Sequence, residues 1–188
     1  MTKQVVAVLG GTGLQGGGVV DALMSADKFA VRVASRNPAS DAARALAARG
    51  VEVVKADLLD PSTLRSALEG AHGAFIVTNF WDPAQMPRET ETGTAAVQAA
   101  RAAGVKHLIW STLPDSEKLT SGRIKVAHFS GKARVDAAVK AAGFARHTFV
   151  MASMYYQNFL GMMAPKPLPN GGRGWAAPID QSHASPKR

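Results

Sequence analysis

The sequence predicts an α/β fold: a doubly wound parallel sheet with helices on both faces. Strand-like and helix-like segments alternate up to about residue 150, which is the pattern of a parallel sheet with helical crossovers. The first strand ends in a glycine cluster that opens directly into a helix, as in dinucleotide-binding sheets. The chain has no cysteines, so the fold depends on a packed core and not on disulfides.

The composition is that of an ordinary globular chain. Hydrophobic residues make up 46% and charged residues 19% of the 188 positions. No apolar run approaches the roughly 20 residues that a membrane helix needs. Residues 1–4 lead straight into the first strand, which leaves no room for a signal peptide. We therefore expect a cytoplasmic protein without a membrane partner.

The formal net charge of +8 has two interpretations. One is a nucleic-acid partner, because basic residues neutralise phosphates; the other is a basic surface that suits an anionic cofactor. The 22 Lys and Arg residues are scattered, with no basic helical stripe, which favours the cofactor over nucleic acid. The 5 histidines stand at unrelated spacings, so no metal site is predicted.

A glycine-rich loop follows the first strand, residues 5–9. Gly10 permits a tight turn, Gly13 leaves room for a pyrophosphate, and Gly16 lets the next helix pack close to the sheet. The free N–H groups and positive dipole end of that helix face an anion. We predict that a dinucleotide is bound by the whole loop, which consists of Gly10, Gly11, Thr12, Gly13, Leu14, Gln15 and Gly16.

The end of the second strand, residues 30–34, decides which dinucleotide is preferred. A site for NAD places an Asp or Glu about twenty residues beyond the glycines, where it accepts from the ribose 2′-OH. Ala34, Ser35 and Arg36 supply no acid, and a guanidinium can instead bind a 2′-phosphate. The sequence therefore predicts NADP(H) in preference to NAD(H); an ordinary surface arginine before a helix is the alternative.

Helices are predicted from apolar periodicity and from their ends. Apolar residues at helical spacing support the first helix, residues 14–25. The second, residues 39–49, and the fourth, residues 88–103, are each followed by a glycine, which favours the left-handed cap. Asp60 and Pro61 begin the third helix as N-cap and first-turn proline. A last helix begins near residue 124, after a loop at 114–121.

Short apolar runs give the remaining strands, at residues 51–55, 73–77, 106–110 and 146–150. Each lies between predicted helices, so the strands run parallel and the crossovers are right-handed. The expected order of the first five strands is 3-2-1-4-5. This order places the ends of the second and fourth strands on either side of the glycine loop.

Candidate cofactor residues follow the third and fourth strands. Asp57 suits the exocyclic amine of an adenine, with Leu58 packed on the ring, and it equally suits the N–H groups of its own turn. Thr78, Asn79 and Phe80 follow the fourth strand. Thr78 and Asn79 suit the second ribose. Phe80 suits either the side of a nicotinamide or substrate, or plain packing at the sheet edge.

Together these motifs resemble the NmrA-like family, atypical relatives of the short-chain dehydrogenases and reductases with a Rossmann fold. The resemblance covers residues 5–163 and includes Trp-Ser-Thr at 110–112 and Tyr-Tyr-Gln-Asn-Phe-Leu at 155–160. It implies that Lys132 faces the nicotinamide ribose. It also implies that a segment closes over the same end of the cofactor; its residues are Tyr155, Tyr156, Gln157 and Asn158.

The resemblance leaves two functions open. Short-chain reductases use a Tyr one helical turn before a Lys, so that both point into the site; here His128 stands four residues before Lys132. The candidate catalytic residues are Lys132, His128 and Ser111 at the end of the fifth strand, and Lys132 also suits pure cofactor binding. The missing Tyr favours a cofactor sensor or regulator. Ser111 and Lys132 keep an NADPH-dependent reductase of small carbonyl or quinone substrates as the alternative.

Members of this family continue after the sixth strand into a substrate-facing lobe. This chain instead becomes rich in Pro, Gly and polar residues, so we divide it into a dinucleotide-binding domain, 1–163, and an irregular tail, 164–188. Loss of most of the lobe fits a truncated product, a frameshifted gene or a cofactor-only variant. The sixth strand then forms an open edge, and we expect a homo-oligomer or a protein partner.

Overall fold

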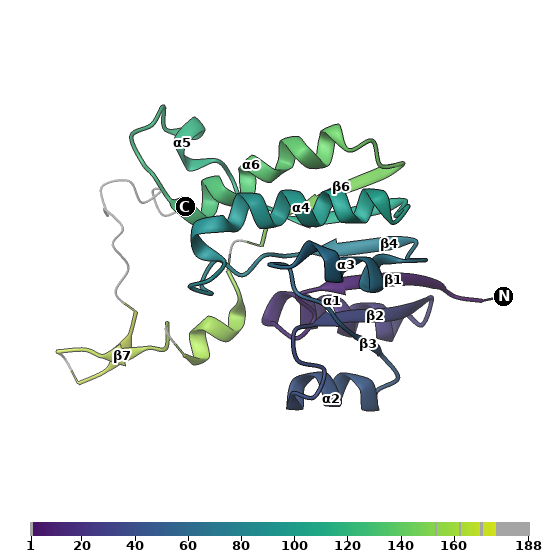
Figure 1. The fold of residues 1–188 in the computed structure, drawn as a ribbon. Coiled ribbons are helices and arrows are strands. Elements are labelled where there is room, and N and C mark those ends of the chain that lie inside the picture. The colour runs from purple at the N-terminus through teal and green to yellow at the C-terminus, as the bar shows by residue number, and fades with distance from the viewer. Residues whose placement is uncertain (1, 153, 162, 170, 176–188) are drawn as a thin grey trace. The chain divides into compact units, whose positions relative to one another are not determined.

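The computed structural model describes residues 2–152, 154–161, 163–169 and 171–175. The chain forms two compact units, Met1–Ser153 and Met154–Arg188. The first unit contains the sheet and its helices (Figure 1). The second contains a 3-10 helix, η3 (Tyr156–Leu160), and a hairpin of β7 (Lys166–Pro167) and β8 (Arg173–Gly174). The segment 155–163, which the sequence groups with the dinucleotide-binding domain, therefore lies in the second unit, and residues 176–188 of the expected tail lie outside the described residues.

The sheet has six strands in the order β3-β2-β1-β4-β5-β6, and all neighbours are parallel. This confirms the expected fold class and strand order. Leu9 pairs with Ala34 on one side and Ile76 on the other, so the ends of β2 and β4 flank the end of β1. The strands are β1 (Gln4–Leu9), β2 (Phe29–Ser35), β3 (Glu52–Lys55), β4 (Gly73–Ile76), β5 (His107–Ser111) and β6 (Arg146–Val150).

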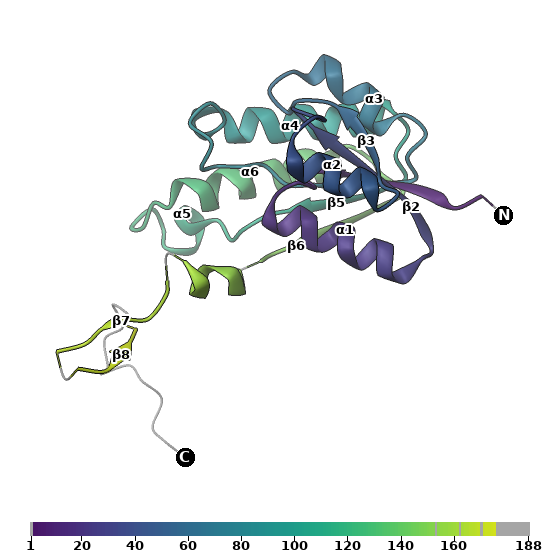
Figure 2. The ribbon, with the colours of Figure 1, turned by 90° about the horizontal axis from the view of Figure 1, so that it is seen from below.

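Helices cover both faces of the sheet (Figure 1 and Figure 2). On one face α1 (Leu14–Ala26) and α2 (Asp41–Ala48) pack on alternate strand residues that include Val8, Val31 and Val33. On the other, intervening residues such as Leu9 and Trp110 pack against α3 (Leu64–Leu68), α4 (Glu89–Ala102) and α6 (Ala127–Ala141). This alternation follows from the two-residue repeat of a strand whose two faces are both buried.

Three local features differ from the sequence predictions. The expected loop at 114–121 contains a short helix, α5 (Ser116–Leu119), because Asp115 Oδ1 accepts from the backbone N–H of Glu117 and of Lys118. The last helix begins at Ala127 and not near 124. The expected irregular tail includes the β7–β8 hairpin, whose turn is closed by a bond from Leu168 N to Gly172 O at 2.8 Å.

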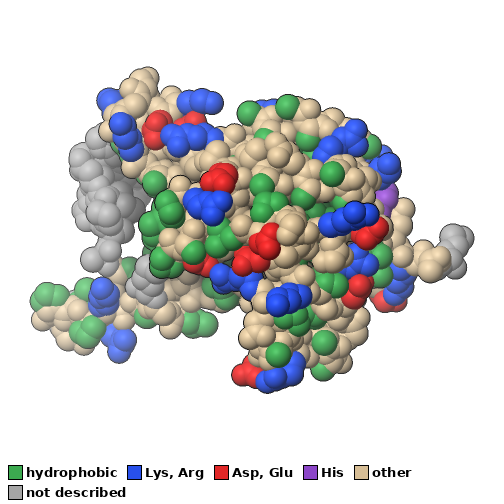
Figure 3. All heavy atoms as spheres, in the orientation of Figure 1, with side chains coloured by type: hydrophobic (Ala, Val, Ile, Leu, Met, Phe, Trp, Pro, Cys, Tyr) green, Lys and Arg blue, Asp and Glu red, His purple; other side chains and the backbone are tan. Residues whose placement is uncertain are grey.

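The surface agrees with the scattered charge seen in the sequence. On the face shown in Figure 3 the basic side chains stand among acidic ones and do not form one continuous patch. Within the described part of the chain, no helix has the length and apolar character needed to cross a bilayer. The same part contains no cluster of three or more His, Cys, Asp or Glu residues placed to hold a metal ion.

Candidate functional site

The glycine loop forms the tight turn that its spacing predicts. Gly10 has φ +91°, and a Cβ there would lie 2.6 Å from Val77 Cγ1. A Cβ on Gly16 would overlap the carbonyl of Gly10, so α1 passes directly against the turn. At Gly13 the nearest atom to a Cβ would be Gly10 O at 3.4 Å, which leaves its outer side open. The loop is therefore compact beneath and accessible above.

The N-terminus of α1 is suited to an anion. Gly13 is its N-cap, no side chain caps it, and its first turn contains no acidic residue. The first N–H groups of a helix have no partner within the helix and carry a partial positive charge. Together with the open side of Gly13, these amides have the chemistry and the space that a pyrophosphate requires.

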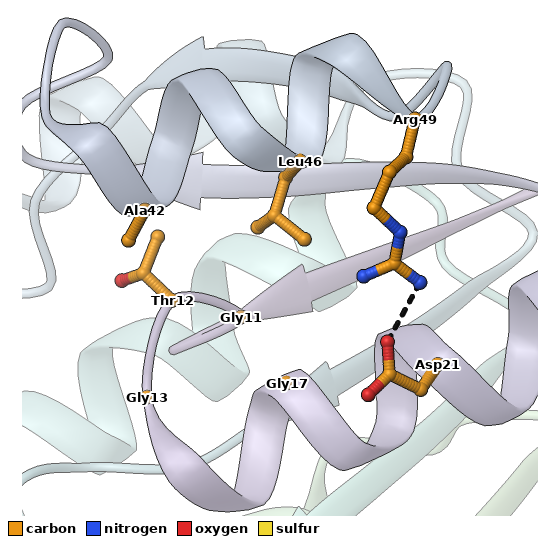
Figure 4. Close-up of a pocket in the computed structure, with 8 residues that line it drawn as sticks. All are labelled: Gly11, Thr12, Gly13, Gly17, Asp21, Ala42, Leu46 and Arg49. Carbon is orange, nitrogen blue, oxygen red and sulfur yellow. Dashed lines mark hydrogen bonds and ion pairs between the residues drawn. The ribbon is translucent and has the colours of Figure 1, made fainter.

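A cavity of about 160 Å³ lies beside the loop, between α1 and α2 (Figure 4). Thr12 points toward Ala42 in this view, and an ion pair between Arg49 and Asp21 spans the far end at 2.7 Å. Ligand pockets commonly enclose about 300–1,000 Å³, so this cavity alone is too small for a dinucleotide. A dinucleotide bound to the loop must extend along the carboxyl ends of the strands.

Arg36, directly after β2, forms an ion pair with Asp82 in the turn after β4, at 2.7 Å from Nη1 to Oδ2. The Arg36 side chain is 56% exposed and that of Asp82 only 14%. Asp82 Oδ1 also accepts from Ala84 N at 3.0 Å. That backbone hydrogen bond, and then the bond from Arg36, hold the pKa of Asp82 below its usual range.

Asp57 and Leu58 lie after β3, where the sequence places an adenine. Asp57 Oδ1 accepts from Leu59 N at 3.0 Å, which is the turn role that was one of its two interpretations. Leu58 is partly buried and packs against the core beneath α3 and α4. A role for either residue toward adenine stays a prediction.

Thr78 and Lys132 meet in a buried polar network at the end of β4. Lys132 Nζ lies 2.8 Å from Thr78 O, 2.6 Å from Thr78 Oγ1 and 2.7 Å from Glu89 Oε1. Thr78 Oγ1 in turn donates to Glu89 Oε1 at 2.8 Å. An ammonium has three N–H donors, and this structure directs all three to protein oxygens. Burial lowers the pKa of Lys132, while the charge of Glu89 and their hydrogen bond oppose that shift.

Asn79, Phe80 and His128 lie beside this network. Asn79 Oδ1 accepts from Trp81 N at 3.2 Å, which shapes the turn after β4. The ring centroid of His128 lies 5.2 Å from that of Phe80 and 5.3 Å from that of Trp81. Burial lowers the pKa of His128; Glu89 opposes this and Lys132 adds to it. The lowered pKa favours the neutral imidazole of His128, which binds a proton less tightly than an ordinary histidine.

Ser111 ends β5 and lies next to the glycine loop. Its Oγ donates to Gln15 Oε1 at 2.9 Å, although the two residues are 96 positions apart. Gln15 belongs to the first turn of α1, so two independently predicted site residues are in contact. The carboxyl ends of β1, β2, β4 and β5 thus bring the loop, Arg36, Thr78 and Ser111 to one edge of the sheet.

The sequence model of the NmrA-like family matches residues 2–186 of this chain. The chain belongs to the NmrA-like family. The match extends beyond the 5–163 that the motifs cover. An NmrA-like family domain-containing oxidoreductase, FrzB from a Cladobotryum species, is 37% identical over 161 residues, which cover 83% of this chain and 48% of FrzB. The chain spans about half the length of the curated relatives it matches.

Solved structures agree with the family. NmrA, described as a negative transcriptional regulator in complex with NADP, has a TM-score of 0.80 at 28% identity, covering 96% of this chain and 56% of NmrA. NmrA has also been solved in complex with NAD. An NADPH-dependent quinone oxidoreductase from Escherichia coli has a TM-score of 0.63 at 26% identity, covering 82% of this chain and 50% of that chain. The similar proteins thus include a regulator and an oxidoreductase.

Two acidic residues at this edge of the sheet were not predicted from the sequence. Glu89 lies on the face of α4 that also carries Gly93, Ala96 and Val97, all of them buried. A lone acid on such a face is itself a signal, because buried carboxylates require a partner. Asp82 lies within the turn after β4 and gave no separate signal. Residues 155–158 lie in the second unit, and their role toward a cofactor stays a prediction.

Proposed function

We propose that this chain binds NADP(H) in preference to NAD(H) and acts as a cofactor sensor or regulator. The observation that carries the proposal is the uncapped N-terminus of α1 behind the glycine loop, with Arg36 exposed at the neighbouring strand end. The loop amides would hold the pyrophosphate and Arg36 the 2′-phosphate. The similar NmrA structures, solved with NADP and with NAD, support a dinucleotide site. A cytoplasmic location and a protein partner or second copy are part of the same proposal.

The polar network supports a sensor over an enzyme. Lys132 has its three N–H donors directed to Thr78 and Glu89, and so has none left for a substrate in this arrangement. Four residues earlier, the position of the usual tyrosine holds His128, whose pKa is lowered by burial. The lowered pKa of His128 disfavours the imidazolium that would donate a proton, and the ammonium protons of Lys132 are held by Thr78 and Glu89. The residues that distinguish a working reductase are therefore absent or engaged.

An NADPH-dependent reductase of small carbonyl or quinone substrates is the second candidate. It is favoured by the oxidoreductase names of the relatives and by Ser111, whose hydroxyl lies at the end of β5 beside Gln15. Bound NADPH supplies a hydride. A Ser111 hydroxyl released from Gln15 would then orient and polarise a carbonyl oxygen, and Phe80 with His128 would form an aromatic wall beside it.

The experiment that tests the shared premise is a fluorescence titration with NADPH and with NADH. Tighter binding of NADPH is expected, because Arg36 adds a charge-assisted contact that NADH cannot make. Tighter binding of NADH would overturn the role of Arg36. Loss of NADPH absorbance with a panel of quinones and aldehydes would then establish the reductase, whereas binding without turnover of any of them is the result expected of a sensor.

A further inference from the structure

The ion pair of Arg36 and Asp82 crosses the edge of the sheet where a dinucleotide must lie. Arg36 follows β2 and Asp82 follows β4, and these strands pair with opposite sides of β1. Adjacent strands lie about 4.8 Å apart, so the pair bridges strand ends that are roughly 10 Å apart. The glycine loop leaves β1 between them. The pair therefore connects the adenosine side of the site to the turn that carries Phe80 and Trp81.

The two partners are held very differently. The carboxylate of Asp82 is fixed by its own turn, since Ala84 N donates to its Oδ1, and its side chain is mostly covered. The guanidinium of Arg36 is more than half exposed and contacts Asp82 through one N–H group. A guanidinium has five N–H donors in a planar fork. Arg36 can thus turn toward another anion while Asp82 keeps its place.

We propose that Asp82 is a specificity-determining residue of the dinucleotide site, whose carboxylate competes with the 2′-phosphate of NADP(H) for the Arg36 guanidinium. The inference rests on the proposed function, because it requires a dinucleotide along this edge. A 2′-phosphate must displace the carboxylate from the guanidinium, which weakens binding of the phosphate. NAD(H) has no such phosphate and leaves the ion pair intact. Asp82 therefore narrows the preference for NADP(H) that Arg36 alone would create.

The displacement has a consequence for signalling. Asp82 lies in the same turn as Trp81, which is 70% exposed and contacts His128. When Arg36 turns toward a phosphate, this turn loses its link to β2. NADP(H) and NAD(H) would then leave the turn in two different states, which is what a sensor needs in order to distinguish the two cofactors.

The test compares the full chain with Asp82→Asn by calorimetric titration with NADP⁺ and NAD⁺. Asn keeps an oxygen that can accept from Ala84 N but loses the negative charge. The ratio of the Kd for NAD⁺ to the Kd for NADP⁺ is expected to rise about fivefold, the upper end of the range for an ion pair with one solvent-exposed partner. The matched control is Asp41→Asn, which removes the same charge from an exposed ion pair with Arg44. It is expected to change the ratio less than about twofold.

A second arm uses Arg36→Gln alone and combined with Asp82→Asn. In the Arg36→Gln background there is no guanidinium to compete for. Asp82→Asn is therefore expected to leave the ratio of the two Kd values unchanged in this background. An unchanged or lowered ratio in Asp82→Asn, or the same gain in both backgrounds, would overturn the inference while the proposed function stands. If the wild-type chain binds neither dinucleotide at millimolar concentration, both fail together.

Discussion

At the scale of single residues, Lys132 and Glu89 form a buried ion pair in the candidate site. Both side chains are at least nine-tenths covered, and their charged atoms are 2.7 Å apart. Glu89 Oε2 lacks a hydrogen-bond partner among the described residues. Gly131 leaves just enough room for this oxygen, since a Cβ there would lie 2.9 Å from it. The pair thus depends on close approach of α4 and α6.

Removing one partner of this pair is expected to be costly. In Glu89→Ala the ammonium of Lys132 stays buried without its counter-charge, which costs about 3–5 kcal/mol of unfolding free energy. Urea denaturation measures the loss. The control Glu91→Ala breaks an exposed pair with Arg88 on the same helix and is expected to lose far less. The double variant Glu89→Leu, Lys132→Met removes both charges and should recover part of the lost unfolding free energy. Equal losses of unfolding free energy in Glu89→Ala and Glu91→Ala would contradict a stabilising role of the buried pair.

Asp136 on α6 predicts a pH dependence. Its Oδ1 is buried without a hydrogen-bond partner in the described part of the chain. Burial raises its pKa from the ordinary 3.8, and a hydrogen bond from Thr112 only partly opposes this. The folded state therefore binds this proton more tightly than the unfolded state, and stability falls as pH rises from 3.8 through the folded-state pKa.

The corresponding variant is Asp136→Asn, which cannot ionise. It is expected to be more stable than the wild type at pH 7, and the difference should vanish below about pH 4. Unfolding free energies measured from pH 3 to pH 8 test this. The control is Asp41→Asn, which changes an almost fully exposed side chain and gives the effect on unfolding free energy of removing a carboxylate that is not buried. A difference that shrinks as pH rises would show that the carboxylate is not disfavoured in the folded state.

The residues that sequence reasoning found and those it missed differ in a physical way. Gly10, Gly16 and Arg36 follow strand ends at fixed spacings, so the local sequence is enough to place them. Asp82 and Glu89 matter because of partners 46 and 43 positions away in the chain. Only the packing of α4 on α6 and the flanking of β1 by β2 and β4 bring these pairs together. A local pattern cannot specify such contacts.

At the scale of elements, α1 offers a matched test of the glycine loop. Gly16 and Gly18 lie on the same helix, but a Cβ on Gly16 would overlap the Gly10 carbonyl, whereas Gly18 has nothing within 4 Å. Gly16→Ala is expected to destabilise the chain by about 1–3 kcal/mol through overpacking against backbone and to weaken NADP(H) binding. Gly18→Ala should stabilise it by about 0.5–1 kcal/mol, because alanine favours a helix. Thermal melts measure the stability of the two variants, and NADPH titrations measure their binding. Equal effects of Gly16→Ala and Gly18→Ala would refute the close approach of α1 to the Gly10 carbonyl.

The elements themselves were largely predictable. The strand at 146–150 has the expected bounds, and the sheet order follows because parallel strands with short helical crossovers have few allowed topologies. The helix α5 was missed because four residues are too few for a periodic signal. It forms because Asp115 caps it and because Ser116 Oγ accepts a hydrogen bond from Val126 N at 2.9 Å. That second contact spans ten positions and is tertiary in origin.

At the scale of the whole molecule, β6 is the last strand of the sheet, and among the described strands it pairs only with β5. Four of its five residues have exposed side chains. An edge strand has a row of unpaired backbone groups that can pair with another chain. The second unit adds exposed apolar side chains of its own, since Tyr156 and Leu160 are 87% and 88% exposed. These surfaces favour association.

We therefore expect the chain to self-associate, with a sedimentation coefficient that rises with protein concentration. Val150→Lys places a charge at the exposed end of β6 and should shift the population toward monomer, because a charged edge resists pairing. Leu119→Lys removes a more exposed apolar side chain from α5, outside the sheet, and should leave the association unchanged. A wild-type chain that sediments as one species at all concentrations would contradict the prediction. Equal dissociation by both variants would instead assign the association to general surface hydrophobicity, because only Val150→Lys alters the strand edge.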